Sequence, residues 1–144
     1  AEQVAGFLEA HERGELRRFT RSQAVAEHWD LGPVKSIVGS QYTDFVNQDR
    51  HVIVEFYAPW CGHCQRLEPR YRAAAEFFEQ AHPGEVVFAK IDGTDNEALG
   101  PHGELIEVEG FPTVLMYPKG KKMPPHPYDL SSRTQTLRDF VNVV

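Results

Sequence analysis

Cysteine is scarce in this chain, which has 144 residues and only two cysteines, Cys61 and Cys64. A structural disulfide stabilises a fold mainly by closing a long loop. A bridge across two intervening residues would contribute only about 2 kcal/mol in the chain-entropy model, before strain is subtracted. A framework of structural disulfides is therefore excluded, and the pair is better placed for chemistry than for holding the chain together.

Long apolar runs and an excess of basic charge are also missing. No stretch approaches the roughly 18 apolar residues that a membrane-spanning helix needs. The formal net charge is −6, from 21 acidic and 15 basic residues, and a mildly acidic surface does not favour nucleic acid or anionic lipid. We therefore expect neither nucleic acid nor a membrane as a partner. The six histidines other than His63 share no metal-ligand spacing, so no metal site is predicted.

The start of the chain shows no secretory signal pattern, and the chain begins within one predicted helix and ends within another. We therefore expect a fragment of a longer protein. Val4, Phe7 and Leu8 fit one face of a short helix within residues 1–19, and that apolar face needs a partner to cover it. Residues 20–34 are typical of a linker that closes on Gly32-Pro33. The organisation predicted is a helix and linker from a preceding domain at 1–34, and one domain at 35–144.

Within 35–144, strand-like and helix-like segments alternate. The run at 51–57 is apolar without clean alternation, as a strand buried on both faces should be. The expected strands are 36–39, 51–57, 86–91, 113–117 and 126–130, and the expected helices are 42–48, 61–80 with Pro69 inside it, and one from Ser132, where Gln135 completes a capping box. This order predicts an α/β sheet with helices on both faces, ending in a hairpin and a helix.

The segment EFYAPWCGHC at 55–64 carries the chemistry. A buried strand runs through a short loop into a helix whose first turn holds both sulfurs. Unpaired N–H groups and the helix dipole favour an anion there, so Cys61 is expected to be the reactive thiolate. Cys64 lies one turn inward. His63, between them, can add positive charge and favour the reduced state, which makes the disulfide form a stronger oxidant.

These residues resemble a known family. FYAPWCGHC at 56–64, AKID at 89–92 and GFPT at 110–113 resemble the catalytic thioredoxin-like domain of protein disulfide isomerases. WDLGPVK at 29–35 is similar to the linker entering the second catalytic domain of these enzymes, and 1–19 resembles the last helix of the domain before it. The resemblance implies a thioredoxin-like three-layer fold, with a central mixed β-sheet flanked by helices. It also implies disulfide isomerase activity and a place in the endoplasmic reticulum lumen.

The resemblance also implies roles for individual residues. Glu55 lies among apolar strand residues, where a carboxyl tends to keep its proton, and the matching family acid exchanges a proton with the inner cysteine, here Cys64. Lys90, in AKID, is expected to pair with Glu55 and tune it. Arg133 falls where the family carries an arginine that swings toward the inner cysteine, although the stretch before it is longer than the family pattern.

A substrate-binding rim is implied around the same motif. Pro112 is expected to be cis and to set backbone against the dithiol, so that a substrate chain docks there as an added strand. Trp60 and Phe111 would give a flat apolar rim beside Gly62, although core packing is an equally good interpretation of Phe111. The stretch 93–110 is several residues longer than the family pattern, and Gly100-Pro101 should replace the helix usually found there with a loop.

No separate cofactor is expected, because the Cys61–Cys64 disulfide is itself the redox group. Glutathione or an upstream thiol oxidase is the expected redox partner, and unfolded or misfolded disulfide-containing proteins are the expected substrates. Three alternatives stay open. The chain could be a thioredoxin-like reductase, although thioredoxins carry proline where this chain has His63. It could be a binding module for unfolded polypeptides with idle thiols, or a C-x-x-C metal module that lacks the other two ligands.

Overall fold

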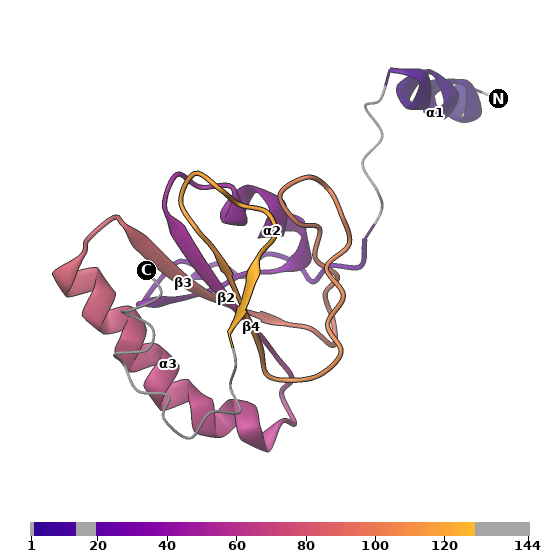
Figure 1. The fold of residues 1–144 in the computed structure, drawn as a ribbon. Helices are drawn as coiled ribbons and strands as arrows, with labels where there is room; N and C mark the ends of the chain where they lie inside the picture. The colour runs from indigo at the N-terminus through magenta and orange to yellow at the C-terminus, as the bar shows by residue number, and fades with distance from the viewer. Residues whose placement is uncertain (1, 14–19, 129–144) are drawn as a thin grey trace.

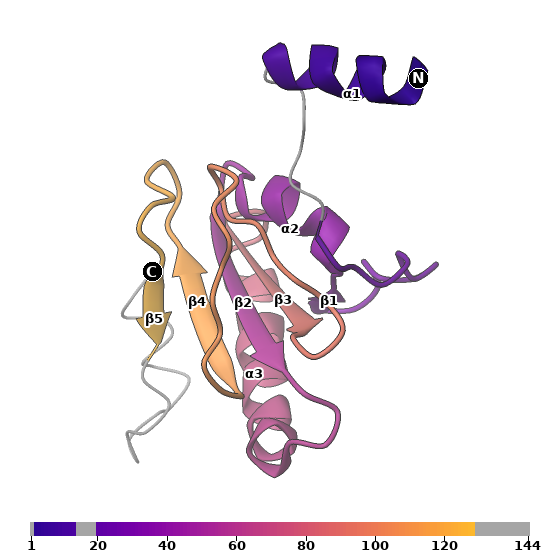
Figure 2. The ribbon, with the colours of Figure 1, turned by 90° about the vertical axis from the view of Figure 1, so that its right-hand side faces the viewer.

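The computed structural model describes residues 2–13 and 20–128, and contains one five-stranded sheet in the order β1-β3-β2-β4-β5 (Figure 2). The strands are β1 Val34–Ser36, β2 His51–Tyr57, β3 Val86–Asp92, β4 Thr113–Tyr117 and β5 His126–Tyr128. β1, β3 and β2 are parallel, whereas β4 and β5 are antiparallel to their neighbours, so the sheet is mixed. The last two strands form the expected hairpin.

Helices cover both faces of the sheet (Figure 1), as the sequence predicted. Helix α3, Gly62–Ala81, packs on one face through a cluster that includes Tyr71 and Phe78. Helix α2, Gly39–Val46, packs on the other face through Tyr42 and Phe45. The result is the expected three-layer α/β architecture. Within the described ranges, no helix is both long and apolar enough to cross a lipid bilayer.

The central strand β2 is buried on both faces, which confirms the interpretation of its unbroken apolar run. Val54 and Phe56 join the cluster under α2, whereas Ile53 faces α3. Because side chains alternate along a strand, Glu55 lies on the α3 face with Ile53. The one acidic residue of the strand is therefore directed at the helix that carries the two cysteines.

The boundaries near α2 were predicted incorrectly. The first strand covers 34–36 rather than 36–39, and the helix starts at Gly39, three residues before the expected 42. The side chain of Gln41 accepts a hydrogen bond from the Val38 N–H at 3.0 Å and closes the first turn, which ends the strand early. A β-carbon at Gly39 would collide with the backbone oxygen of Glu97, so glycine permits this close approach.

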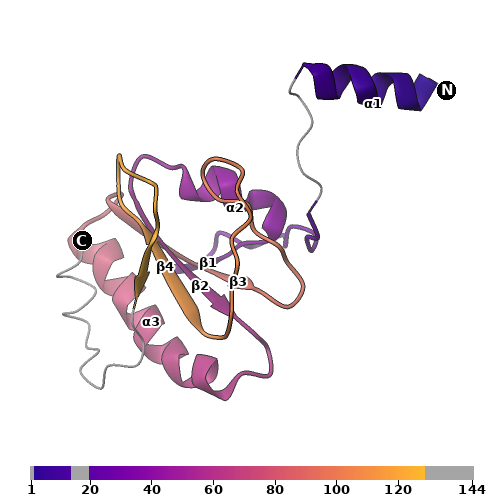
Figure 3. The same cartoon turned by 45° about the vertical axis from the view of Figure 1, so that its right-hand side comes forward.

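The segment between β3 and β4 contains no helix in the structure, which confirms the lengthened loop. It folds back through a bridge between Leu99 and Leu105 and lies beside α2 (Figure 3). The Thr43 hydroxyl donates to the Leu99 carbonyl at 2.7 Å, and the Asn47 amide donates to the Pro101 carbonyl at 3.2 Å. This loop therefore adds to the layer formed by α2. It does so in the part of the chain where the family usually has a helix.

Residues 20–33 have no regular strand or helix, as a linker should, yet they are docked on the domain. Arg21 and Glu97 exchange two hydrogen bonds, at 2.7 and 3.1 Å. Gln23 and Asn96 exchange two more, at 2.8 and 2.9 Å. Trp29 packs edge-on against Phe45 with ring centroids 6.3 Å apart. The linker thus belongs to the packed surface of the domain that follows it.

The N-terminal helix α1 spans Glu2–Glu12 and confirms the predicted helix, with Val4 and Leu8 exposed. Its origin in a preceding domain stays a prediction, as does the need of its apolar face for a partner. The predicted closing helix, with Ser132 and Gln135, lies outside the described residues.

The buried hydroxyl pair between Tyr42 and Tyr117 allows a test of the α2 layer. Both rings are fully buried, and the two hydroxyl oxygens are 2.9 Å apart. Tyr42→Phe removes the hydroxyl partner of Tyr117 and should lower the free energy of unfolding by about 1–2 kcal/mol. The second change, Tyr117→Phe, removes the hydroxyl that Tyr42→Phe leaves without a partner. The free energy of unfolding of the double variant should therefore be little lower than that of Tyr42→Phe alone. Urea unfolding of both single variants and the double variant measures this, and additive losses would contradict a direct hydrogen bond.

Candidate active site

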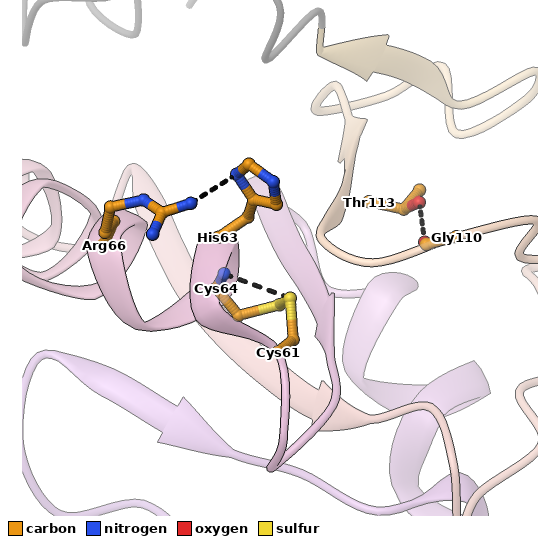
Figure 4. The surroundings of a disulfide bond; sticks show 6 residues. All are labelled: Cys61, His63, Cys64, Arg66, Gly110 and Thr113. Atoms are coloured by element: carbon orange, nitrogen blue, oxygen red, sulfur yellow. Dashed lines mark hydrogen bonds between the residues drawn. A yellow bond between two sulfur atoms is a disulfide. The ribbon is translucent and has the colours of Figure 1, made fainter.

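The two cysteines form a disulfide at the N-terminus of α3 (Figure 4). Cys61 is the N-cap residue, and its sulfur accepts a hydrogen bond from the Cys64 backbone N–H at 3.2 Å. A turn from Ala58 to Cys61, closed at 3.1 Å, brings the chain from β2 into the helix. The sulfur of Cys61 therefore lies at the unpaired N–H groups of the helix, where a thiolate is stabilised.

Both sulfurs are enclosed in this oxidised form. Cys61 and Cys64 are each 5% exposed, so neither residue is more open to solvent than the other here. They form a small apolar cluster with Ala58, against which Tyr57 and Phe111 pack. The disulfide is thus held between the start of α3 and the loop that carries Phe111.

His63 is held from the same helix by an arginine that the sequence analysis did not single out. Nδ1 of His63 and a terminal guanidinium nitrogen of Arg66 are 2.9 Å apart (Figure 4). A guanidinium only donates, so His63 accepts through Nδ1 and carries its proton on Nε2 in this arrangement. The contact adds the charge of Arg66 to the same exposed turn of α3. The role of His63 in favouring the reduced state stays a prediction.

The loop before β4 lies against the dithiol, where the resemblance places Pro112. The Phe111–Pro112 peptide bond is cis, as expected. The Thr113 hydroxyl donates to the Gly110 carbonyl at 2.6 Å and closes the loop around it. Trp60 is 73% exposed, and its ring meets that of Phe111 edge-on with centroids 6.1 Å apart. Phe111 also packs against the core under α2, so both interpretations of this residue apply.

Glu55 and Cys64 line one cavity of about 110 Å³ behind the disulfide. Glu55 is 3% exposed, and burial raises the pKa of its carboxyl from 4.5 to about 7. The charge of Lys90 lowers this pKa in part, and the charge of Glu68 raises it. A carboxyl with a pKa near neutrality can both take a proton from a thiol and return it.

Lys90 lies where the sequence analysis placed it, directly beside Glu55 on the neighbouring strand β3. Its ammonium nitrogen lies 5.5 Å from the centroid of the Tyr57 ring, and the residue lines the same cavity. Its tuning role stays a prediction. Gly62 is exposed in the first turn of α3, with the Arg66 guanidinium nearby. Arg133 lies outside the described residues, and its role also stays a prediction.

Two functional candidates were missed, Arg66 and Glu68. Their spacing contained a signal, because residues three and four apart share a helix face: Arg66 is three residues after His63, and Glu68 is four after Cys64. Among residues 2–13 and 20–128, no group of three or more His, Cys, Asp or Glu side chains is placed to hold a metal ion.

The raised pKa of Glu55 predicts a pH-dependent stability. Below pH 4.5, the ordinary pKa of this carboxyl, the group is protonated in both the folded and the unfolded state, so it adds no pH dependence to the free energy of unfolding. Between 4.5 and about 7, the unfolded state ionises while the folded state keeps its proton, so stability falls as the pH rises, by about 3 kcal/mol in total. Glu55→Gln cannot ionise and should remove this loss.

Urea unfolding of the oxidised protein between pH 4 and pH 8 measures the effect. The stability of Glu55→Gln relative to the native chain should rise with pH through this range. Glu107→Gln, a matched change in an exposed glutamate of the 93–110 loop, should show no such rise. Parallel curves for the native chain and Glu55→Gln would mean that the Glu55 pKa is not raised.

Comparison with known proteins agrees with this geometry. Residues 33–143 match the thioredoxin family. The chain is 41% identical over 124 residues to protein disulfide-isomerase A3 of Gallus gallus, covering 85% of this chain and 23% of that protein. It is 36% identical over 130 residues to protein disulfide-isomerase of Saccharomyces cerevisiae, covering 90% and 24%. The chain thus spans about a quarter of the length of these relatives.

A solved structure shows the same fold. The first thioredoxin domain of mouse protein disulfide-isomerase A4 superposes with a TM-score of 0.59 at 29% identity, covering 85% of this chain and 84% of that domain. The family match covers the whole sheet, both packed helices and the dithiol. The fold, the C-x-x-C disulfide at a helix N-terminus and the sequence match agree, and this chain belongs to the thioredoxin family.

Proposed function

We propose that this chain is a thiol–disulfide oxidoreductase and isomerase that acts on the disulfides of folding proteins. The observation that carries the proposal is the cavity shared by Glu55 and Cys64, directly behind a dithiol at a helix N-terminus. A disulfide that only stabilises the fold does not need a buried acid of raised pKa beside its inner sulfur. The similarity to two curated protein disulfide isomerases supports the same activity.

In isomerisation, the Cys61 thiolate attacks a substrate disulfide and forms a mixed disulfide. One substrate sulfur leaves as a thiolate and attacks another disulfide of the substrate, which re-pairs its cysteines. Where this stalls, Glu55 takes the proton of Cys64, and the Cys64 thiolate attacks the sulfur of Cys61. The substrate then leaves reduced, and Cys61–Cys64 is the oxidised product. Oxidation of a substrate dithiol runs these steps in reverse.

Substrate binding is proposed at the rim formed by Trp60, Phe111 and Pro112. The exposed Trp60 ring offers apolar area next to the disulfide, and the loop at 110–113 offers backbone against which an extended chain can lie. Unfolded chains expose both apolar side chains and unpaired backbone, so they fit such a rim. Binding would therefore accompany the chemistry rather than replace it.

The cellular setting belongs to this proposal. We infer that the chain is a catalytic domain of a longer protein disulfide isomerase in the endoplasmic reticulum lumen, with 1–34 joining it to a preceding domain. Glutathione or an upstream thiol oxidase would reoxidise the dithiol. The similarity to proteins named protein disulfide-isomerase supports this setting.

The order of attack has a direct test in Cys64→Ser. Removing the resolving thiol should leave the mixed disulfide on Cys61 without a release step, so covalent complexes with a reduced and denatured substrate protein should accumulate. Non-reducing electrophoresis with mass spectrometry of the cross-linked peptide detects them. The matched variant Cys61→Ser should trap few or none. Equal trapping by both variants would contradict the assignment of Cys61 as the attacking thiol.

The reduction potential separates the proposed activity from its alternatives. In glutathione buffers, followed by Trp60 fluorescence, we expect a value near −180 mV, the figure for protein disulfide isomerase itself. A value near −270 mV, as in thioredoxin, would identify a reductase instead. A pair that shows no reversible transition would leave a polypeptide-binding module as the better account.

A further inference from the structure

A buried acid that exchanges protons needs a route to solvent, and Glu55 itself is almost fully covered. The residue is 3% exposed, with the sheet on one side and α3 on the other. Glu55 lines two cavities. One, of about 110 Å³, is also lined by Cys64, and the second, of about 120 Å³, is also lined by Leu31, Gly32 and Pro33 of the linker.

Glu68 lines both cavities together with Glu55 and Lys90. It follows Cys64 by four residues, so the two side chains share one face of α3. Unlike Glu55, it is exposed to solvent. Polar cavities of this size can hold water molecules that bridge the groups lining them. Glu68 therefore lines both cavities of Glu55 and is also exposed to bulk water.

The charges around Glu55 come from every element packed against it. Lys90 faces it from β3 and Tyr57 from its own strand, while Tyr71 and Arg72 face this region from α3. The Tyr71 hydroxyl donates to the Ala89 carbonyl at 2.6 Å, so its proton is already used. Arg72 pairs with Glu76 at 3.3 Å and only donates. Among the groups that line the two cavities around Glu55, the remaining carboxyl is that of Glu68.

We propose that Glu68 is a positioning residue that passes the proton between Glu55 and solvent during each thiol–disulfide exchange, an inference that rests on the proposed function. When Cys64 is deprotonated, Glu55 takes the proton, and the Cys64 thiolate forms its bond to Cys61 while the substrate thiolate leaves. The proton then moves from Glu55 through cavity water to Glu68 and into bulk solvent. Glu55 is left ionised, and when a substrate dithiol re-reduces the pair, a proton returns by the same route through Glu68 and Glu55 to the Cys64 thiolate. No oxidant other than the disulfide is consumed.

The test is the steady-state oxidation of a reduced, denatured substrate protein between pH 5.5 and pH 9, with oxidised glutathione at saturation. Every cycle then passes a proton out to solvent and back, so the turnover rate depends on the route as well as on the attack of Cys64 on Cys61. In Glu68→Gln the saturating rate at the upper end of this range should fall by about threefold or more. This loss is smaller than the roughly 10²- to 10⁴-fold acceleration that a directly acting acid or base contributes to the rate. Small diffusible buffers such as imidazole should restore the rate, as they do when a proton route is lost.

Two further variants complete the comparison. Glu68→Asp keeps a carboxyl at this position and should retain most of the native rate. Glu79→Gln changes an exposed glutamate on α3 that lines neither cavity, and should behave as the native chain. In a Cys64→Ala background, Cys61 should be alkylated at the same rate with and without the Glu68→Gln change, because the inferred role acts on Cys64 alone.

The outcomes are distinguishable. A native saturating rate in Glu68→Gln, with or without a shifted pH midpoint, would overturn the proton route, since a purely electrostatic effect moves the midpoint alone. A lowered rate that imidazole leaves unchanged would overturn it as well. If the native chain and Glu79→Gln both fail to oxidise the substrate protein, the proposed function itself fails.

Discussion

The burial of β2 on both faces is the constraint on which the rest of this structure depends. A central strand covered by α2 on one side and α3 on the other fixes the direction in which each of its side chains points. Because α3 begins only a few residues after β2 ends, its N-terminus has to lie at the edge of the same sheet. The strand therefore brings Cys61 to the helix end and Glu55 behind Cys64, and the distant loop that carries Phe111 then packs against the two cysteines.

The two cysteines consequently have different electrostatic surroundings although they share one helical turn. Cys61 is the N-cap, close to unpaired N–H groups and near the exposed Arg66 and His63 pair, where negative charge is favoured. Cys64 faces the cavity of Glu55, whose carboxyl has a pKa of about 7 because burial disfavours its charge. One sulfur is thus prepared to be a thiolate, and the other is prepared to exchange its proton.

A single buried amide holds together three segments near the C-terminal end of β3. Asn96 is 4% exposed, and its oxygen accepts from the backbone N–H groups of Gly39 at 3.0 Å and Gln23 at 2.9 Å. Its nitrogen donates to the Asp92 carbonyl at 3.0 Å. The end of β3, the start of α2 and the linker are therefore fixed to one side chain. The linker is oriented relative to the sheet by hydrogen bonds that a free tether would not make.

The sequence by itself determined the chemistry, the fold class and most elements, because these depend on local signals. The unbroken apolar run of β2, the C-x-x-C spacing and the position of Pro112 are each contained in a few consecutive residues. The early start of α2 has a local hydrogen bond between Val38 and Gln41, but the close approach of Gly39 to the Glu97 backbone, 58 positions away, could not be predicted from local signals. Spacing along the chain indicates that Glu68 shares a helix face with Cys64, but only the tertiary structure placed Glu68 at the cavities of Glu55 and docked the linker on Asn96. Both of these depend on contacts between segments that are far apart in the sequence, and only packing brings such segments together.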